Sequence, residues 1–222
     1  MEVLFVSTIL EKIFELFITN FESTMKNFGI KFDEMEKQAR CIYFIGEAIK
    51  TSNDFSEPLS NIITEVFLDL SQSIYHASQS QYRSAFQSIR SALELTMAVI
   101  YFADHPIEFI RWCRDTFDFQ FTKATKEILS DEYCDALDTR IKIREDEIFI
   151  LYRELSQYVH GKFSFLTVEQ NGTAFQYDDE QINTFDRIYT NSFYIIIALY
   201  QYRFEAYIDN ACSDYPYLKN YI

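Results

Sequence analysis

The two residues best suited to chemistry are Arg153 and His160, which lie seven positions apart in the stretch RELSQYVHGK. A histidine titrates near neutral pH, so it can take a proton from a ribose 2′-hydroxyl or give one to a leaving oxygen. An arginine presents a planar set of donors that can hold the negative charge that develops on phosphorus. The pair therefore suits cleavage of a phosphodiester bond without a metal ion.

The periodicity of the apolar residues around this pair predicts a helix over residues 143–160. On a helical wheel, Gln157 and His160 lie within about 40° of Arg153, and Ser156 lies about 60° away, opposite the apolar side chains. The arginine and the histidine stand two turns apart, roughly 10 Å along the axis, so one helix does not bring both to the same atom. An antiparallel second copy would place the arginine of each chain near the histidine of the other. Without it, the same residues form an ordinary solvated face.

A second polar stripe is predicted on a helix over residues 82–104, where Arg90 and Glu94 are four positions apart. Arg90 is a candidate for a further phosphate contact, and Glu94 is a candidate for orienting Arg153 or His160. The alternative is an exposed ladder of Glu–Arg pairs, each of which stabilises the helix by about 0.2–0.5 kcal/mol.

The residues around both stripes resemble the HEPN superfamily, small helical proteins that are common in prokaryotic toxin and anti-phage systems. Arg153 and His160 fit its R-x4–6-H pattern. The segments LYRELSQYVHG, QYRSAFQSIRSALEL and YFADHPIEFIRW, all within residues 81–161, look like segments of prokaryotic HEPN-like proteins. One position departs from the ribonuclease members, since Glu154 follows the arginine where they often carry Asn, Asp or another small polar residue.

The resemblance implies an all-α, HEPN-like antiparallel helical bundle that forms a homodimer, with two R-x4–6-H motifs facing a shared cleft. It also implies metal-independent endoribonuclease activity on an RNA substrate, in a toxin or anti-phage defence effector. Arg153 would bind the phosphate and His160 would be the catalytic histidine. The supporting residues would be Ser156, Gln157, Glu94 and Arg90. No cofactor and no metal is expected, and an antitoxin or defence-system subunit is the expected protein partner.

The net charge of the chain bears on whether it binds nucleic acid. The chain carries a net charge of −14, which disfavours an extended, non-specific footprint on nucleic acid. The basic residues are nevertheless uneven, since 11 of the 20 lie within residues 81–162. Two alternatives therefore stay open: a catalytically inactive helical interaction module, antitoxin-like or a scaffold subunit, and a site for a nucleotide or small ligand between helices.

Composition predicts a single all-α domain over residues 1–222. Only three prolines and four glycines interrupt a chain that is 48% hydrophobic, whereas an all-β chain of this length would need many more turns. One segment departs from the helical pattern: alternating runs on either side of Asn171-Gly172 predict a small β-hairpin insertion near residues 165–177. The helices are expected over 2–27, 33–50, from Pro58, over 82–104, 107–117, within 118–142, and over 143–160 and 179–211.

The remaining polar residues carry weaker signals. Cys41, Cys113, Cys134 and Cys212 are scattered, which is typical of buried free thiols rather than of a zinc site. His76 and His105 are expected to be structural. The N-terminal apolar run is interrupted by charges and reads as an amphipathic helix, so a cytoplasmic protein with no membrane partner is expected.

Overall fold

The computed structural model describes residues 2–52, 54–130, 132–133, 144–160 and 176–222. All regular structure within these residues is helical, which confirms the predicted all-α class. The elements are α1 (Glu2–Ser52), α2 (Glu57–Ser78), α3 (Tyr82–Asp104), α4 (Pro106–Trp112), α5 (Phe121–Ile128), α7 (Glu145–Val159), α9 (Asp179–Asp214) and a terminal 3₁₀ helix, η2 (Pro216–Asn220). None of the described helices combines the length and the apolar run needed to cross a bilayer.

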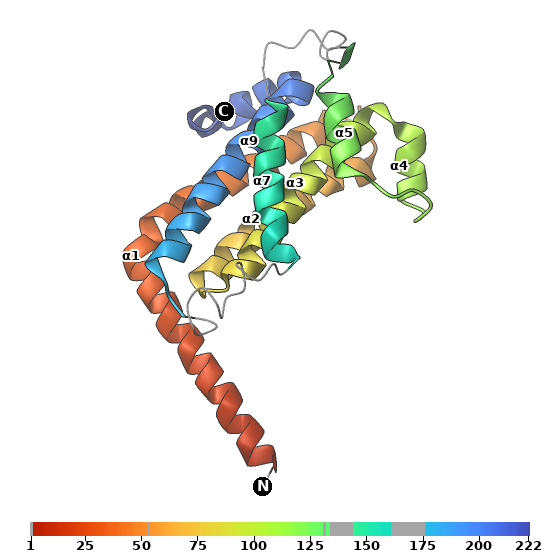
Figure 1. Ribbon diagram of the computed structural model, residues 1–222. Helices are drawn as coiled ribbons and strands as arrows, with labels where there is room; N and C mark the ends of the chain where they lie inside the picture. The colour runs from red at the N-terminus through yellow and green to blue at the C-terminus, as the bar shows by residue number, and fades with distance from the viewer. Residues whose placement is uncertain (1, 53, 131, 134–143, 161–175) are drawn as a thin grey trace.

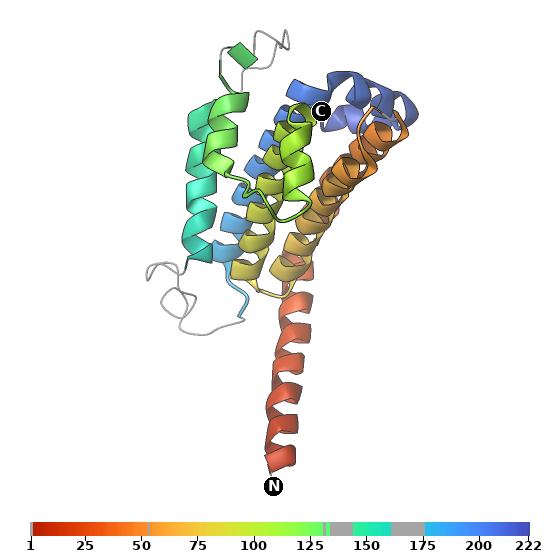
Figure 2. The same ribbon diagram turned by 90° about the vertical axis from the view of Figure 1, so that its right-hand side faces the viewer.

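The long helices form a bundle with α3 at its centre. Helices α2, α5, α7 and α9 all pack against α3, and α1 lies along α2 and α9 on the other side (Figures 1 and 2). Fourteen of the residues of α3 are buried, which agrees with its central position. Helix α7 lies on the outside of this core, so one of its faces is open to solvent.

The predicted helix boundaries hold where the sequence carries strong local signals. Pro58 lies in the first turn of α2, where a missing backbone N–H costs nothing. The Asp104-His105-Pro106 sequence ends α3 and starts α4, because His105 leaves the helical region with φ −122° and ψ 62°. At the start of α9, the carboxylate of Asp178 accepts a hydrogen bond of 2.8 Å from the amide of Gln181.

Two boundary predictions are wrong. The helix predicted over 107–117 ends at Trp112, as α4, and Asp115 leaves the right-handed helical region with φ 54°. The other error concerns Gly29. The helix expected to stop near Gly29 continues, so the two predicted segments 2–27 and 33–50 are one helix, α1. A glycine inside a helix costs about 1 kcal/mol relative to alanine. Phe28 and Phe32 lie on either side of it and are both buried, with the rings of Phe32 and Phe185 of α9 6.3 Å apart. Burial of these two side chains outweighs the cost of the glycine.

Aromatic side chains connect four helices through the core. Phe185 of α9 lies 6.4 Å from Phe86 of α3 and 5.8 Å from Tyr189, measured between ring centroids. Phe86 also contacts Tyr158 of α7 at 4.1 Å. Tyr189 is fully buried and donates a hydrogen bond of 2.9 Å to the carbonyl of Met35 in α1. These aromatic contacts fix α7 against the core.

The N-terminal part of α1 projects beyond the bundle as an arm (Figures 1 and 2). No side chain from Leu10 to Thr19 is buried, whereas Phe28 and Phe32 further along are. Leu10 and Phe14 are 61% and 65% exposed. Such large apolar side chains in water are unusual when they follow one another along a single helix.

Some predictions fall outside the described residues or need correction. The hairpin expected near 165–177 lies outside them except for Gln176 and Tyr177, which are not in a regular element. Cys41 and Cys212 are buried free thiols, as expected, but Cys113 is exposed because it follows α4 at the surface.

Candidate functional site

Helix α7 presents the predicted pair on its open face. Arg153 and His160 are both exposed, whereas Leu151 and Leu155 are buried against the core. The helical-wheel division into a polar and an apolar face is therefore confirmed. In the part of the chain that the structure describes, neither the Arg153 nor the His160 side chain makes a hydrogen bond or an ion pair.

His160 stands at the C-terminal end of α7. Its amide donates a hydrogen bond of 3.0 Å to the carbonyl of Ser156. Arg83 of α3 donates one of 3.2 Å to the carbonyl of Val159, which satisfies a carbonyl that has no partner within the helix. The end of α7 is thereby attached to α3, and the backbone that carries His160 is held in place.

Ser156 and Gln157 occupy the edge of the same face, and both are half-buried. The hydroxyl of Ser156 donates a hydrogen bond of 2.7 Å to the carbonyl of Tyr152, one turn earlier. Its only proton is therefore used within α7, and the oxygen is left as an acceptor for anything bound beside Arg153.

The predicted supporting pair, Arg90 and Glu94, is brought to α7 through Tyr152. The guanidinium of Arg90 donates to Glu94 at 2.8 Å and to the hydroxyl of Tyr152 at 2.7 Å. The same hydroxyl donates to the carboxylate of Glu94 at 2.5 Å. The three groups close a triangle between α3 and α7. Within the described residues, Arg90 and Glu94 bind this neighbour of Arg153 and make no hydrogen bond or ion pair with Arg153 or His160.

This triangle fixes Tyr152 in position. Burial and the hydrogen bond to Glu94 raise the pKa of Tyr152, and the nearby Arg90 only partly opposes them, so the hydroxyl keeps its proton at neutral pH. The ring of Phe121 from α5 stacks on that of Tyr152, with centroids 3.9 Å apart and planes at 13°. Helices α3 and α5 thus hold the turn of α7 from which Arg153 projects.

Glu154, the residue that departs from the family pattern, faces away from this triangle. Its carboxylate forms an ion pair of 2.5 Å with Arg187 of α9. The hydrogen bonds that Arg187 donates to Glu154 raise the pKa of Arg187, as expected for a paired guanidinium. The acid next to Arg153 is therefore occupied by a partner on another helix.

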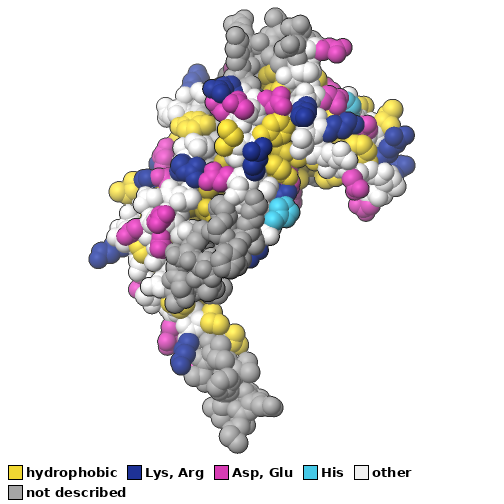
Figure 3. All heavy atoms as spheres, viewed as in Figure 1, with side chains coloured by type: hydrophobic (Ala, Val, Ile, Leu, Met, Phe, Trp, Pro, Cys, Tyr) yellow, Lys and Arg dark blue, Asp and Glu magenta, His cyan; other side chains and the backbone are white. Residues whose placement is uncertain are grey.

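A hollow of about 390 Å³ opens beside Arg153, between α5 and α7. The hollow could not be predicted from the sequence, because Lys126 and Thr122 come from α5, a separate helix whose boundaries local signals do not fix. Figure 3 shows the face on which α7 lies, where hydrophobic side chains are exposed between basic and acidic ones. The hollow is lined by Thr122, Lys126, Phe149, Tyr152, Arg153 and Ser156.

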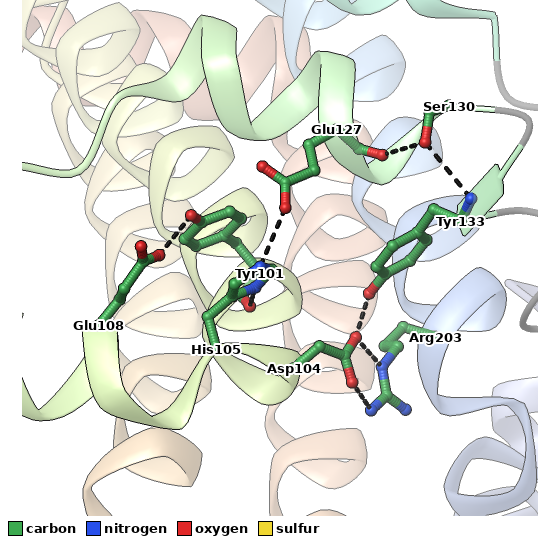
Figure 4. Close-up of polar contacts among 8 residues, drawn as sticks. All are labelled: Tyr101, Asp104, His105, Glu108, Glu127, Ser130, Tyr133 and Arg203. Atoms are coloured by element: carbon green, nitrogen blue, oxygen red, sulfur yellow. Dashed lines mark hydrogen bonds and ion pairs between the residues drawn. The ribbon is translucent and has the colours of Figure 1, made fainter.

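A second polar cluster, also missed from the sequence, surrounds His105 at the junction of α3 and α4 (Figure 4). One ring nitrogen of His105 lies 2.7 Å from the carbonyl of Tyr101, and the other lies 2.9 Å from the carboxylate of Glu127 in α5. The rings of Tyr101 and His105 are stacked 4.0 Å apart, and the hydroxyl of Tyr101 donates to Glu108 of α4. The cluster joins three helices, which fits the expected structural role of His105.

The same junction is attached to α9. Arg203 donates two hydrogen bonds to Asp104, the last residue of α3, and Tyr133 donates a third (Figure 4). Burial on its own would raise the pKa of Asp104, but the hydrogen bonds from Arg203 and Tyr133 outweigh it and lower that pKa. His76, the remaining histidine, lies 3.1 Å from the side chain of Gln81 at the turn between α2 and α3.

The donor sets offer no place for a metal within the described residues, where no three His, Cys, Asp or Glu side chains converge. No family model, no curated protein and no solved structure matches the chain.

Proposed function

We propose that the protein is a HEPN-like, metal-independent endoribonuclease that acts as a toxin or anti-phage defence effector. The observation that carries the proposal is the exposure of Arg153 and His160 on one open face of α7, with the acid between them, Glu154, paired elsewhere. The paired acid does not compete for Arg153, and an antiparallel second copy would bring the arginine of each chain and the histidine of the other to one anionic ligand.

In the proposed reaction the 2′-oxygen of a ribose attacks the adjacent phosphorus. With an antiparallel second copy in place, His160 of one chain takes the proton from that oxygen, and Arg153 of the other chain donates hydrogen bonds to the phosphoryl oxygens as their negative charge grows. The bond from phosphorus to the 5′-oxygen breaks, and a second, protonated histidine gives its proton to the leaving oxygen. The products are a 2′,3′-cyclic phosphate and a 5′-hydroxyl. Because α7 supplies one histidine, a second copy of the chain would supply the other.

The test is cleavage of RNA in EDTA by the purified protein. His160→Ala should lower the rate by about 10²–10⁴-fold, the usual contribution of a positioned acid–base group, and Arg153→Ala should lower it comparably. His105→Gln and Arg111→Ala are matched controls outside α7, and both should cleave at the wild-type rate if thermal unfolding shows an intact fold. Wild-type activity in His160→Ala would refute the proposal.

A second candidate function, a catalytically inactive interaction module, is favoured by the arm of α1. Leu10, Phe14, Phe17 and Phe21 follow one another at spacings of four, three and four residues, the pattern of a coiled-coil seam. Another helix would pack against this seam. We propose the arm of a second copy, since the stretch 10–30 has three acids and two bases, whereas the chain as a whole carries −14. Two copies can therefore meet at this stretch with little electrostatic repulsion. A basic partner would be attracted more strongly to the rest of the chain, which carries most of the negative charge.

Light scattering after size-exclusion chromatography tests this pairing. The wild type should be a dimer and Phe14→Glu a monomer, while Ile107→Glu, at an equally exposed position of α4, should stay dimeric. A monomeric wild type would exclude pairing through the arm. If Phe14→Glu loses both the dimer and the RNA cleavage of the wild type, the result supports the ribonuclease proposal. If the wild type is a dimer that does not cleave RNA, the result supports the interaction module. An antitoxin or a defence-system subunit as a further partner is part of both proposals.

A further inference from the structure

We propose that the hollow between α5 and α7 is the nucleotide-binding subsite of the protein, with an RNA phosphate on Lys126 and Arg153 and a base against Phe149. The identity of the ligand as RNA rests on the proposed function. The site itself rests on three observations: two cations that make no hydrogen bond or ion pair with any described residue, a half-buried aromatic wall, and a rigid frame around both.

The cations come from two helices and converge on one hollow. Lys126 projects from α5 and Arg153 from α7, and both line it. Among the described residues neither side chain makes a hydrogen bond or an ion pair. In a chain of net charge −14, two adjacent unpaired cations with no acid in the lining are a local exception that favours an anionic ligand.

The acids nearest in sequence are all engaged with other partners. Glu127, next to Lys126, lies 2.9 Å from His105, and Glu154, next to Arg153, lies 2.5 Å from Arg187. Glu94, behind Tyr152, accepts from Arg90 at 2.8 Å. These three carboxylates are therefore engaged with other side chains, and none of them lines the hollow.

The aromatic wall that a base can reach is Phe149. Phe121 already stacks on the ring of Tyr152, and the guanidinium of Arg90 lies 5.0 Å from the centre of that ring. Phe149 is half-buried, and none of the aromatic contacts that the described residues make involves its ring. Bases of every type stack on an exposed aromatic ring, so this wall favours a nucleotide without selecting its sequence.

Size and rigidity agree with this assignment. A volume of about 390 Å³ lies within the range of small-ligand sites and suits a single nucleotide. Tyr152 is held by Arg90, Glu94 and Phe121, and Ser156 is held by its bond to the Tyr152 carbonyl. The acceptor oxygen of Ser156 and the hydroxyl of Thr122, four residues before Lys126, are placed to bind ribose hydroxyls.

The experiment measures binding of a fluorescent 2′-O-methyl RNA hexanucleotide by anisotropy, with a probe that cannot be cleaved because its 2′-oxygen is blocked. Lys126→Ala and Phe149→Leu should each weaken binding about tenfold or more. Lys126→Ala should also reduce the slope of the logarithm of the binding constant against the logarithm of the salt concentration by about one. The matched controls are Lys123→Ala on the same helix and Ile150→Ala beside Phe149. Both positions are exposed outside the lining, and both variants should bind within twofold of the wild type.

Equal affinity of the wild type and both lining variants would overturn the subsite, as would failure of the wild type to bind the probe. Thermal unfolding of each variant separates a lost contact from a lost fold. The result is independent of catalysis. The cleavage assay with His160→Ala tests the proposed reaction, whereas binding of the blocked RNA tests the subsite in the hollow. Either proposal can therefore fail while the other holds.

Discussion

Arg203 of α9 donates hydrogen bonds of 3.0 and 2.6 Å to the carboxylate of Asp104, at the end of α3. The two residues are 99 positions apart in the sequence, so this pair closes a long loop of chain. It also anchors the junction from which α4 and the His105 cluster begin.

The first prediction concerns the pH dependence that this pair creates. The pKa of Asp104 is lower in the folded protein than in the unfolded chain. Its stabilising contribution is therefore complete above the unfolded pKa, near pH 4, and is lost as the pH falls through the folded pKa. The Tm of the wild type should fall more steeply below pH 4 than that of Asp104→Asn. Asp33→Asn, at an exposed position of α1, is the control and should follow the wild-type profile.

The second prediction has the opposite sign. Burial raises the pKa of Asp69 in α2, although a hydrogen bond from Ser91 partly opposes it. The ionised carboxylate thus costs stability above the folded pKa, and this cost disappears below the unfolded one. Asp69→Asn should raise the Tm at pH 7, and the gain should vanish near pH 3. A lower Tm for this variant at pH 7 would contradict the assignment.

The third prediction concerns the triangle behind Arg153. Tyr152→Phe removes the hydroxyl that bridges Arg90 and Glu94 and keeps the ring that stacks on Phe121. The free energy of unfolding should decrease by about 1 kcal/mol, the usual net contribution of a hydrogen bond. Tyr194→Phe, an exposed tyrosine of α9, should leave it unchanged in urea titrations. Equal effects at both positions would show that the triangle adds nothing to stability.

The fourth prediction uses two glycines of α1 as a matched pair. A Cβ at Gly29 would lie 3.4 Å from the flexible end of Met25, so Gly29→Ala should gain about 0.5–1 kcal/mol of helix stability. A Cβ at Gly46 would lie 3.1 Å from Cγ2 of Ile63, which is buried and fixed between α1 and α2. Gly46→Ala should therefore lower the Tm while Gly29→Ala raises it. The same sign for both variants would be inconsistent with this packing.

Local signals were enough to predict some elements. Pro58 and the Asp104-His105-Pro106 sequence act through their own backbone restrictions, so α2, α3 and α4 begin or end close to where they were expected. The helix end predicted near Gly29 is wrong because the cost of a glycine within the helix is outweighed by the packing of Phe32 against Phe185. Only the tertiary fold creates that contact.

Part of the candidate site could likewise be predicted from local sequence, and part of it depends on the tertiary fold. The open face with Arg153 and His160 follows from one helical period, and it could be predicted without any other part of the fold. Lys126 beside Arg153, and Tyr152 between Arg90 and Glu94, depend on how α3 and α5 pack against α7. Residues on separate helices carry no spacing that reveals such a meeting.

The arm of α1 has a consequence for amide hydrogen exchange. Its backbone hydrogen bonds between residues 10 and 19 are shielded by no buried side chain, and a helix that stands alone is marginal in water. Opening there requires no disruption of the core, so these amides should exchange with deuterium orders of magnitude faster than those near Ile42 and Ile45 of the same helix. A second arm lying on the first would slow that exchange, and the effect would grow with protein concentration. The protection of one half of a single helix thus reports directly on whether two chains have met.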